Sequence, residues 1–514
     1  MTSAAPSRVL PGAPVAVVHR ARRLGIDTGH TAVVYLHRGS EIVRSEGLDS
    51  ETRVVVSAGG HTLLATLGVV SGDLLRPDEA GLSEAAWDRL AIPPDAPVSV
   101  GHAPPLDSLR HVRAKIHGLR LDRAAMDAVV QDVAAGRYTD IHIASFLTAC
   151  AGERLDRREM IDLTTAMVAA GVRLTWPSRP VMDKHSVGGL PGNRTTPVVV
   201  GLAPAAGLLM PKTSSRAITS PAGTADTMAV LTCVELDAEA MRRVVEREGG
   251  CIVWGGAARL SPADDVLIRV ERPLDLDASG QLVASVLSKK AAAGATHVLL
   301  DLPVGPTAKI RSLADAERLA GQVRDVGRAV GLEVMPLVTD GTQPVGRGVG
   351  PALEARDVLA VLRCEAGAPE DLRDRALLLA GCVLEMSGAV PAGCGHAEAR
   401  SILDGGRARR KFEAICRAQG GLREPPTAGF RREVPAPHGG RVGAIDNRRL
   451  ARVAKLAGAP ADPAAGLELH VRLGQTVEAG APLFTVHAES AGELEYALGY
   501  ARQQSEIITL AEPS

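Results

Sequence analysis

Apolar and polar residues alternate with different periods in different parts of the chain, which predicts several domains of different kinds. Near the N-terminus, residues 15–18, 31–36 and 54–56 form short runs rich in Val. Gly, Asp and Pro separate these runs, as is typical of strands joined by turns. We therefore expect a β-rich domain over residues 1–103, with the proline-rich stretch 92–105 as its exit.

The pattern then changes to a helical period. Apolar side chains recur at intervals of three and four residues from Met126 to Val133 and from Ile143 to Cys150, as on one face of a helix. A further helix is expected after Asp156, which can serve as its N-cap. These features predict a helical domain over residues 104–179, which part of 275–295 is expected to join.

From residue 180 onward, strand-like apolar runs alternate with glycine turns and helical stretches. This pattern is typical of an α/β domain with a mostly parallel sheet, which we assign to residues 180–428. The runs 296–302 and 333–339 lead directly into glycine loops, and ligands bind at the carboxyl ends of parallel strands. Period-two alternation returns over residues 429–514, where an α+β domain is expected. The chain is thus predicted to be an α/β multidomain protein.

Composition narrows the class of protein. With 58 Lys and Arg against 59 Asp and Glu, the net charge of -1 creates no overall field that would gather nucleic acid or an anionic membrane. Seven cysteines occur without a CxxC pair or a Cys/His metal spacing, which fits a reducing compartment and no metal site. The uncharged stretch from Thr195 to Pro211 contains Gly and Pro and is too short to span a bilayer, so we interpret it as a buried helix or strand. No signal peptide is expected. We therefore expect a cytoplasmic protein that binds neither nucleic acid nor membranes.

The stretch from Asp183 to Thr196, DKHSVGGLPGNRTT, holds the first candidate chemistry. A lysine, an imidazole and a hydroxyl precede glycines that allow backbone N–H groups to converge, and a helix-compatible run follows. This combination suits a tetrahedral oxyanion such as phosphate. The residue order of a Walker A loop is absent, so ATP is not the expected ligand. Taken alone, the stretch fits a glycine-rich surface turn equally well.

A second stretch from Lys212 to Asp226, KTSSRAITSPAGTAD, is rich in hydroxyl side chains beside two cations. Hydroxyls can donate to phosphate or sugar oxygens without charge repulsion. Such a segment also fits ordinary turn chemistry. Because the two stretches flank one apolar segment, we predict that they fold against each other and cradle a single anion.

Both stretches resemble the signature of the thymidine and pyrimidine-nucleoside phosphorylases, in detail that of their longer branch, which includes the archaeal AMP phosphorylases. Further matching stretches are SPADDVLIRVERPLDLDASGQLVASVLSKK, DLPVGPTAK and GVGPALEARDV. The similarity extends over about residues 10 to 510 and includes an N-terminal extension that shorter thymidine phosphorylases lack. It implies a pentosyltransferase with inorganic phosphate as co-substrate, no cofactor or metal, and at least a homodimer.

The resemblance also implies roles for individual residues. The positions that match phosphate contacts of the family are Lys184, His185, Ser186, Thr196, Ser214 and Thr224. The positions that match nucleotide contacts of the AMP branch are Gly189, Ser215, Arg216, Ala217, Ile218, Thr219, Ser220, Thr224, Ser285 and Lys309. The catalytic candidates are Asp277, which matches a proposed proton donor, and His185. In the shorter enzymes a serine, a lysine and an arginine bind the base; the matching positions are Ser285, Lys289 and either Arg269 or Arg272.

Several alternatives remain open. Without a ligand role, Asp277 would cap a helix or turn, Lys289 would lie at a solvated helix end, and His185 would be structural. Ser-Pro-Ala-Gly at 220–223 replaces the His-Thr-Gly-Gly typical of thymidine phosphorylases, and the arginine spacing differs by one residue. Both departures weaken thymidine as the only substrate.

The expected reaction is phosphorolysis of a nucleoside or deoxynucleoside to base and (deoxy)ribose 1-phosphate, as in thymidine phosphorylases. The alternative is an AMP-type phosphorylase that releases ribose 1,5-bisphosphate, which Arg216 or Lys309 facing the 5' carbon would favour. A phosphoribosyltransferase would need a diphosphate and magnesium site rich in acids, and Asp183 is the only acid in the first loop. A non-catalytic nucleotide-binding regulator is the remaining alternative.

Overall fold

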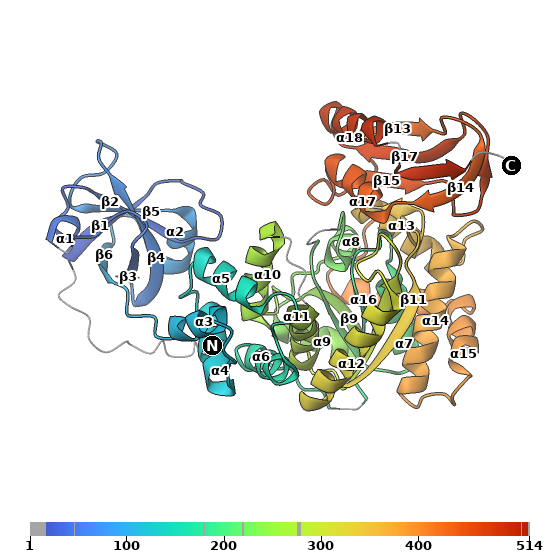
Figure 1. The fold of residues 1–514 in the computed structure, drawn as a ribbon, viewed down its shortest axis with the longest axis horizontal. Helices are drawn as coiled ribbons and strands as arrows, with labels where there is room; N and C mark the ends of the chain where they lie inside the picture. Colours follow the sequence, from blue (N-terminus) through green and yellow to red (C-terminus); the bar gives the residue numbers. More distant parts are fainter. Residues whose placement is uncertain are drawn as a thin grey trace. The chain divides into compact units, whose positions relative to one another are not determined.

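The computed structural model describes residues 17–45, 47–177, 180–217, 220–274, 279–504 and 506–511. The chain divides into two compact units, Met1–Leu109 and Arg110–Ser514 (Figure 1). Three of the predicted site residues lie outside the described residues, namely Ile218, Thr219 and Asp277.

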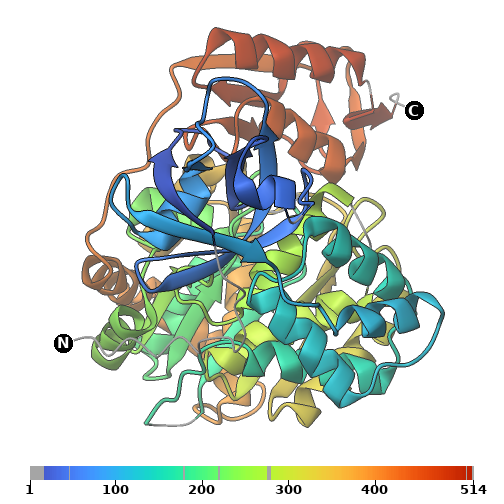
Figure 2. The ribbon, with the colours of Figure 1, turned by 90° about the vertical axis from the view of Figure 1, so that its left-hand side faces the viewer.

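The first unit is a closed β-barrel with the strand order β1-β5-β2-β4-β3-β6, shown in blue in Figure 2. Its elements are β1 (Val17–Arg23), β2 (Val33–His37), α1 (Glu41–Ser45), β3 (Arg53–Ala58), β4 (His61–Val70), β5 (Glu79–Leu82), α2 (Glu84–Leu90) and β6 (Pro97–His102). Antiparallel pairing of β6 with β1 closes the barrel. Alternate side chains of a strand point to opposite faces, so Val54 and Val56 are fully buried in the barrel interior.

A group of helices begins the second unit. They are α3 (Leu109–Ile116), α4 (Arg123–Ala134), α5 (Asp140–Cys150) and α6 (Arg157–Ala169). Leu109, the first residue of α3, is the last residue of the first unit. Two helices from later in the chain, α10 (Pro262–Leu274) and α11 (Ser279–Ala292), pack against them. The N-cap predicted at Asp156 is confirmed, because its carboxylate accepts a hydrogen bond from the backbone N–H of Glu159 at 2.9 Å.

Parallel strands form the centre of this unit. They are β7 (Met182–Ser186), β8 (Met210–Ser214), β9 (Gly250–Trp254), β10 (His297–Val304) and β11 (Glu333–Asp340). They pair in the orders β11-β10-β7 and β8-β9, and a parallel bridge between Val181 and Leu209 makes β7 and β8 neighbours. The predicted mostly parallel sheet is therefore confirmed.

Helices surround these strands and complete the core. They are α7 (Thr195–Ala205), α8 (Thr224–Leu231), α9 (Ala238–Glu248), α12 (Leu313–Ala329), α13 (Pro351–Arg363), α14 (Glu370–Met386), α15 (Gly395–Asp404) and α16 (Arg407–Ala418). The uncharged stretch that begins at Thr195 forms α7 and the start of β8, and Val198, Leu202 and Met210 within it are fully buried. The prediction of a buried segment there is confirmed. Among the described residues, no helix is both long enough and apolar enough to cross a bilayer.

The C-terminal part combines two small sheets with two helices (Figure 1). Its elements are β12 (Gly348–Val349), β13 (Phe430–Pro435), β14 (Gly440–Ile445), α17 (Asn447–Leu456), β15 (Gly466–Leu469), β16 (Thr476–Val477), β17 (Pro482–Ala488), α18 (Ala491–Gln503) and β18 (Ile508–Ala511). The buried side chain of Asn447 donates to Thr307 Oγ1 and to the carbonyl oxygen of Gly341, both at 3.0 Å. The C-terminal part thereby holds the loops that follow β10 and β11.

Candidate functional site

The two predicted anion-binding turns leave neighbouring strands at one edge of the sheet. The first turn, residues 183–196, begins in the last residues of β7, which ends at Ser186, and the second turn, residues 212–226, begins in the last residues of β8, which ends at Ser214. Because β7 and β8 are parallel neighbours, their carboxyl ends lie side by side. Arg194 of the first turn also donates to the carbonyl oxygen of Ala222 in the second. The prediction that the two turns fold against each other is confirmed.

Lys184 places a cation at the start of the first turn. Its side chain is fully buried, and its ammonium donates to Ser186 Oγ and Thr195 Oγ1, both at 2.6 Å, and to Thr196 Oγ1 at 3.3 Å. Burial lowers the pKa of Lys184 to about 8, although the nearby carboxylate of Asp301 acts in the opposite direction. The turn therefore surrounds a buried ammonium with hydroxyl groups.

The first residue of the first turn, Asp183, places a carboxylate against two further lysines. Asp183 is fully buried; it accepts a hydrogen bond from Lys212 Nζ at 3.1 Å and lies 3.2 Å from Lys290 Nζ. Both lysine side chains are 3% exposed. Burial lowers the pKa of Lys290 well below its ordinary value, and Asp183 opposes this shift. Two lysines against one carboxylate bias this region towards positive charge.

His185 lies on the same strand, where lysines dominate its surroundings. Burial lowers the pKa of its imidazole well below the ordinary value, and the positive charges of Lys290, Lys212, Lys289 and Lys184 lower it further. The ring is therefore neutral at neutral pH. A neutral imidazole can donate one hydrogen bond and accept another.

The second turn presents buried hydroxyl groups that the described residues leave unsatisfied. Thr213 Oγ1 and Ser214 Oγ are buried and have no hydrogen-bond partner within the described part of the chain. Buried polar atoms normally have a partner, so these two oxygens mark a place where a polar ligand fits. Thr224 begins α8 nearby, and the N-terminus of a helix favours an anion.

Asp226 holds the second turn in shape. Its carboxylate accepts from the backbone N–H groups of Ala217 at 2.6 Å and Gly223 at 2.9 Å. It also accepts from Arg216 at 3.1 Å, and Arg216 pairs in addition with Glu235 at 2.8 Å. The Arg216 guanidinium lies 5.1 Å from the ring centroid of Trp254. Arg216 is thus already engaged by two carboxylates and an aromatic ring.

The base-binding candidates lie on α10 and α11. Lys289 forms an ion pair with the buried carboxylate of Asp264, and Ser285 lies one turn before it on α11. Arg269 forms a two-point ion pair with Asp140, with both N–O distances at 2.8 Å. Arg272 is exposed near the end of α10. Of the two arginines, Arg269 is therefore the one already held within the helical part.

The loop that carries Lys309 packs directly on the first turn. Gly189 has a φ of +95°, and a β-carbon there would lie 2.8 Å from the backbone nitrogen of Lys309. This close approach requires glycine at position 189. The Lys309 side chain is exposed. The ammonium of Lys309 is thus on a loop beside the first turn and accessible to a ligand.

One buried acid at this edge, Asp301, was not among the predicted site residues. Asp301 lies on β10, between β7 and β11, and hydrogen bonds link it to Ser186, Asn193 and Thr339. The signal available in the sequence was an acid within the apolar run 296–302, where an unpaired charge would be costly.

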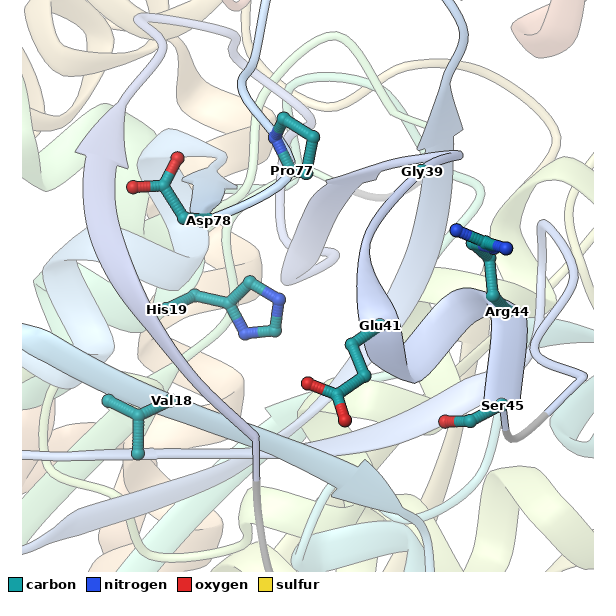
Figure 3. A pocket seen from close by; sticks show the side chains of 8 residues that line it. All are labelled: Val18, His19, Gly39, Glu41, Arg44, Ser45, Pro77 and Asp78. Carbon is teal, nitrogen blue, oxygen red and sulfur yellow. The ribbon is translucent and has the colours of Figure 1, made fainter.

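A hollow of about 660 Å³ lies in the barrel unit (Figure 3). Its lining is Val18, His19, Gly39, Glu41, Arg44, Ser45, Pro77 and Asp78. This lining mixes acidic and basic side chains and contains none of the predicted site residues.

We expect Gly223→Ala to destabilise the second turn. A β-carbon at this position would lie 2.5 Å from the carbonyl oxygen of Ser215 and 2.6 Å from the carbonyl carbon of Arg216. Because backbone must move to relieve this overlap, the free energy of unfolding should fall by about 1–3 kcal/mol. Urea denaturation measures the change. Gly321→Ala, at an exposed position of α12 with no atom within 4 Å, should not destabilise the protein; equal losses in the two variants would contradict the packing argument.

Phosphate affinity is expected to fall as the pH rises through about 8, because Lys184 loses its proton there. The KM for phosphate should approach a tenfold increase per pH unit above that value, and Lys184→Met should abolish this dependence. The effect on stability has the opposite sign. Between about 8 and the ordinary value of 10.5, only the unfolded chain keeps this proton, so the contribution of Lys184 to stability rises with pH. A flat phosphate KM from pH 7 to 10 would disprove the assignment.

Comparison with known proteins finds three matching family domains along the second unit. Residues 110–171 match the helical bundle domain of a glycosyl transferase family, and residues 178–409 match the a/b domain of a glycosyl transferase family. Residues 441–508 match the pyrimidine nucleoside phosphorylase C-terminal domain. The matched segments thus cover the helical part, the parallel strands and the C-terminal part.

Close relatives match nearly the whole chain. "Putative thymidine phosphorylase 1" of Acidovorax sp. (strain JS42) is 62% identical over 493 residues, which is 96% of each chain. A protein of the same name from Cupriavidus necator is 57% identical over 511 residues, 98% of each chain. Among solved structures, anthranilate phosphoribosyltransferase from Thermus thermophilus matches with a TM-score of 0.50 and 21% identity. It covers 60% of this chain and 99% of its own, and the likeness shows a shared fold.

Proposed function

The chain belongs to the pyrimidine-nucleoside phosphorylase family, and from this premise we propose that it cleaves thymidine or a related pyrimidine nucleoside with inorganic phosphate. The products are the free base and deoxyribose or ribose 1-phosphate. One observation carries the proposal: two turns at the same sheet edge combine a buried lysine with buried hydroxyls that have no partner among the described residues.

The chemistry requires stabilisation of charge at two places. The bond between C1' of the sugar and the base nitrogen breaks, a bond from C1' to a phosphate oxygen forms, and the proton that hydrogen phosphate loses ends on the departing base. Positive charge grows on the sugar and negative charge on the base. Lys184, Ser214 and the N-terminus of α8 are suited to hold the phosphate nucleophile below C1'.

Among the residues that the structure describes, Lys289 is the candidate for stabilising the leaving base. Its ammonium pairs with Asp264 and remains 20% exposed, so a base oxygen could share it. His185, neutral and adjacent to Lys184, can donate a hydrogen bond to the sugar or to phosphate. Removal of the Lys289 charge should therefore lower kcat more than it raises the phosphate KM.

A second substrate class follows from Lys309. Its exposed ammonium lies on the loop packed against Gly189, so it could bind a phosphate at the 5' carbon. A nucleoside 5'-monophosphate would then be cleaved to base and ribose 1,5-bisphosphate. Arg216, the other residue expected to favour the monophosphate, is engaged by Asp226 and Glu235. We therefore rank the nucleoside first.

The deciding experiment offers thymidine, uridine, AMP and CMP separately with inorganic phosphate and follows the released base. We expect thymidine or uridine to be cleaved at least ten times more efficiently, in kcat/KM, than either monophosphate. Preference for a monophosphate, lost selectively in Lys309→Met, would establish the second candidate in its place. Absence of cleavage in every case would reject both.

A phosphoribosyltransferase is the main alternative from a different reaction class. It would need carboxylates free to organise a metal-bound diphosphate. Asp183, the acid of the first turn, is fully buried and faces two lysines instead. Incubation of the protein and free bases with phosphoribosyl diphosphate and Mg²⁺ tests this alternative; formation of a nucleotide would contradict the proposed function.

A further inference from the structure

Asp301 connects β7 and β11, the two strands that flank its own strand. It lies on β10 and its side chain is fully buried. Its Oδ2 accepts from Ser186 Oγ at 2.6 Å and from Asn193 Nδ2 at 3.3 Å, and its Oδ1 accepts from Thr339 Oγ1 at 2.6 Å. Ser186 comes from β7, Asn193 from the glycine turn and Thr339 from β11. One carboxylate thus fixes three segments at the phosphate edge.

The hydrogen bonds of Ser186 determine what its hydroxyl can offer to a ligand. A serine hydroxyl has a single proton and two acceptor lone pairs. That proton points to Asp301 Oδ2, while Lys184 Nζ donates to one lone pair at 2.6 Å. The remaining capacity of Ser186 Oγ is one lone pair. Towards an anion at this turn, Ser186 can therefore accept a hydrogen bond but not donate one.

We propose that Asp301 makes the anion site selective for an oxyanion that carries a proton, by holding Ser186 as an acceptor. Hydrogen phosphate and hydrogen arsenate can donate their O–H to Ser186 Oγ. Sulfate has no proton at neutral pH, so one of its oxygens would face the serine lone pair without a hydrogen bond. The inference rests on the proposed function, because it assigns phosphate to this turn.

Other groups of the site complement this arrangement. Thr213 Oγ1 and Ser214 Oγ have no hydrogen-bond partner among the described residues and can donate to the unprotonated oxygens of the anion. Lys184 adds its positive charge, because its three N–H donors are already taken by Ser186, Thr195 and Thr196. Sulfate would satisfy these donors as well as phosphate does, so the contact with Ser186 alone separates the two anions. Buried groups left without a hydrogen bond discriminate strongly between otherwise similar ligands. Asp301 is thus a positioning residue that acts through Ser186.

The test is direct binding of phosphate, arsenate and sulfate to the full-length protein by calorimetry at pH 7.5 (about neutral, where both protonated anions are present). Wild-type protein should bind phosphate and arsenate similarly and sulfate about 100-fold more weakly. In Asp301→Asn the ratio of sulfate to phosphate Kd should fall by at least about tenfold. A neutral amide is a weaker acceptor than a carboxylate, so an anion can compete for the serine proton.

Ser186→Ala provides a second variant that does not alter the buried carboxylate. Removal of the acceptor should weaken phosphate binding and leave sulfate binding nearly unchanged, so the ratio should again decrease. Asp340→Asn, at the exposed carboxyl end of β11, is the matched control and should keep the wild-type ratio. If Asp301 had a purely structural role, Asp301→Asn would weaken the binding of both anions equally, and the ratio of sulfate to phosphate Kd would stay constant.

The outcomes separate this inference from the proposed function. Sulfate bound by wild-type protein as tightly as phosphate would overturn the inference, even if nucleosides are cleaved. An equal loss of affinity for phosphate and sulfate in both Asp301→Asn and Ser186→Ala would also overturn it. Selective phosphate binding that depends on Asp301, in a protein that cleaves no nucleoside, would support the inference and reject the proposed reaction.

Discussion

Lys184→Met is expected to reduce kcat/KM for phosphorolysis on the order of 10³-fold. Lys184 provides the buried positive charge of the first turn, and Ser186, Thr195 and Thr196 hold its ammonium in place. Methionine keeps much of the length of the side chain but removes the charge and all three N–H donors. Because burial of this cation costs free energy, as its lowered pKa of about 8 indicates, the variant should remain folded.

Steady-state kinetics with phosphate as the varied substrate measure this effect, and thermal unfolding checks the fold. The matched control is Lys115→Met. Lys115 is also buried, and its ammonium contacts Glu159 at 2.6 Å in the helical part. This control should lose stability, because Glu159 remains as an unpaired buried carboxylate, but it should keep kcat/KM when assayed well below its melting temperature. Activity of Lys184→Met within tenfold of wild type would contradict the proposed phosphate site.

Asp183→Asn is expected to lower the free energy of unfolding by about 3–5 kcal/mol. The substitution retains the shape of the side chain but removes the negative charge between Lys212 and Lys290, whose side chains are both 3% exposed. Two ammonium groups would then be buried without a compensating carboxylate at this position. The loss should exceed that of any single exposed ion pair, which contributes about 0–1 kcal/mol.

Urea denaturation at several pH values tests this prediction. Burial already lowers the pKa of Lys290, so the unfolded chain binds more protons than the folded one below the ordinary lysine value. The contribution of Lys290 to stability therefore rises with pH, and the deficit of Asp183→Asn should shrink as the solution becomes alkaline. Asp183→Asn combined with Lys212→Met should recover part of the stability, since only one cation remains. A deficit below about 1 kcal/mol at neutral pH would show that water or neighbouring dipoles compensate the lysines.

Local patterns were sufficient for much of the fold. The N-cap at Asp156 and the buried segment from Thr195 depend on neighbours within a few residues, and both predictions are confirmed. The turn from Asp183 to Thr196 could also be recognised locally, because glycines, a lysine and hydroxyls within one short segment favour an anion. The roles of individual site residues remain predictions that the kinetic and binding experiments above address.

The partners of these residues could not be derived in the same way. Ser186 and Asp301 are 115 residues apart, and Thr339 and Asp301 are 38 apart. Strands of a parallel sheet appear in sequence as continuous apolar runs that carry no information on their order. The same limitation applies to Arg269, whose partner Asp140 is 129 residues away. The family resemblance placed Arg269 among the ligand candidates, whereas its ion pair lies within the helical part.

The sequence by itself determined the family, the parallel α/β character and the two turns that offer a cation and hydroxyls, because each is encoded in contiguous residues. Only the tertiary structure decided that β10 lies between β7 and β11 and so brings Asp301 to Ser186. It also decided that Lys212 and Lys290 share one buried carboxylate. The physical reason is that hydrogen-bond geometry and charge compensation depend on distances in space, which the order of strands in the sheet sets.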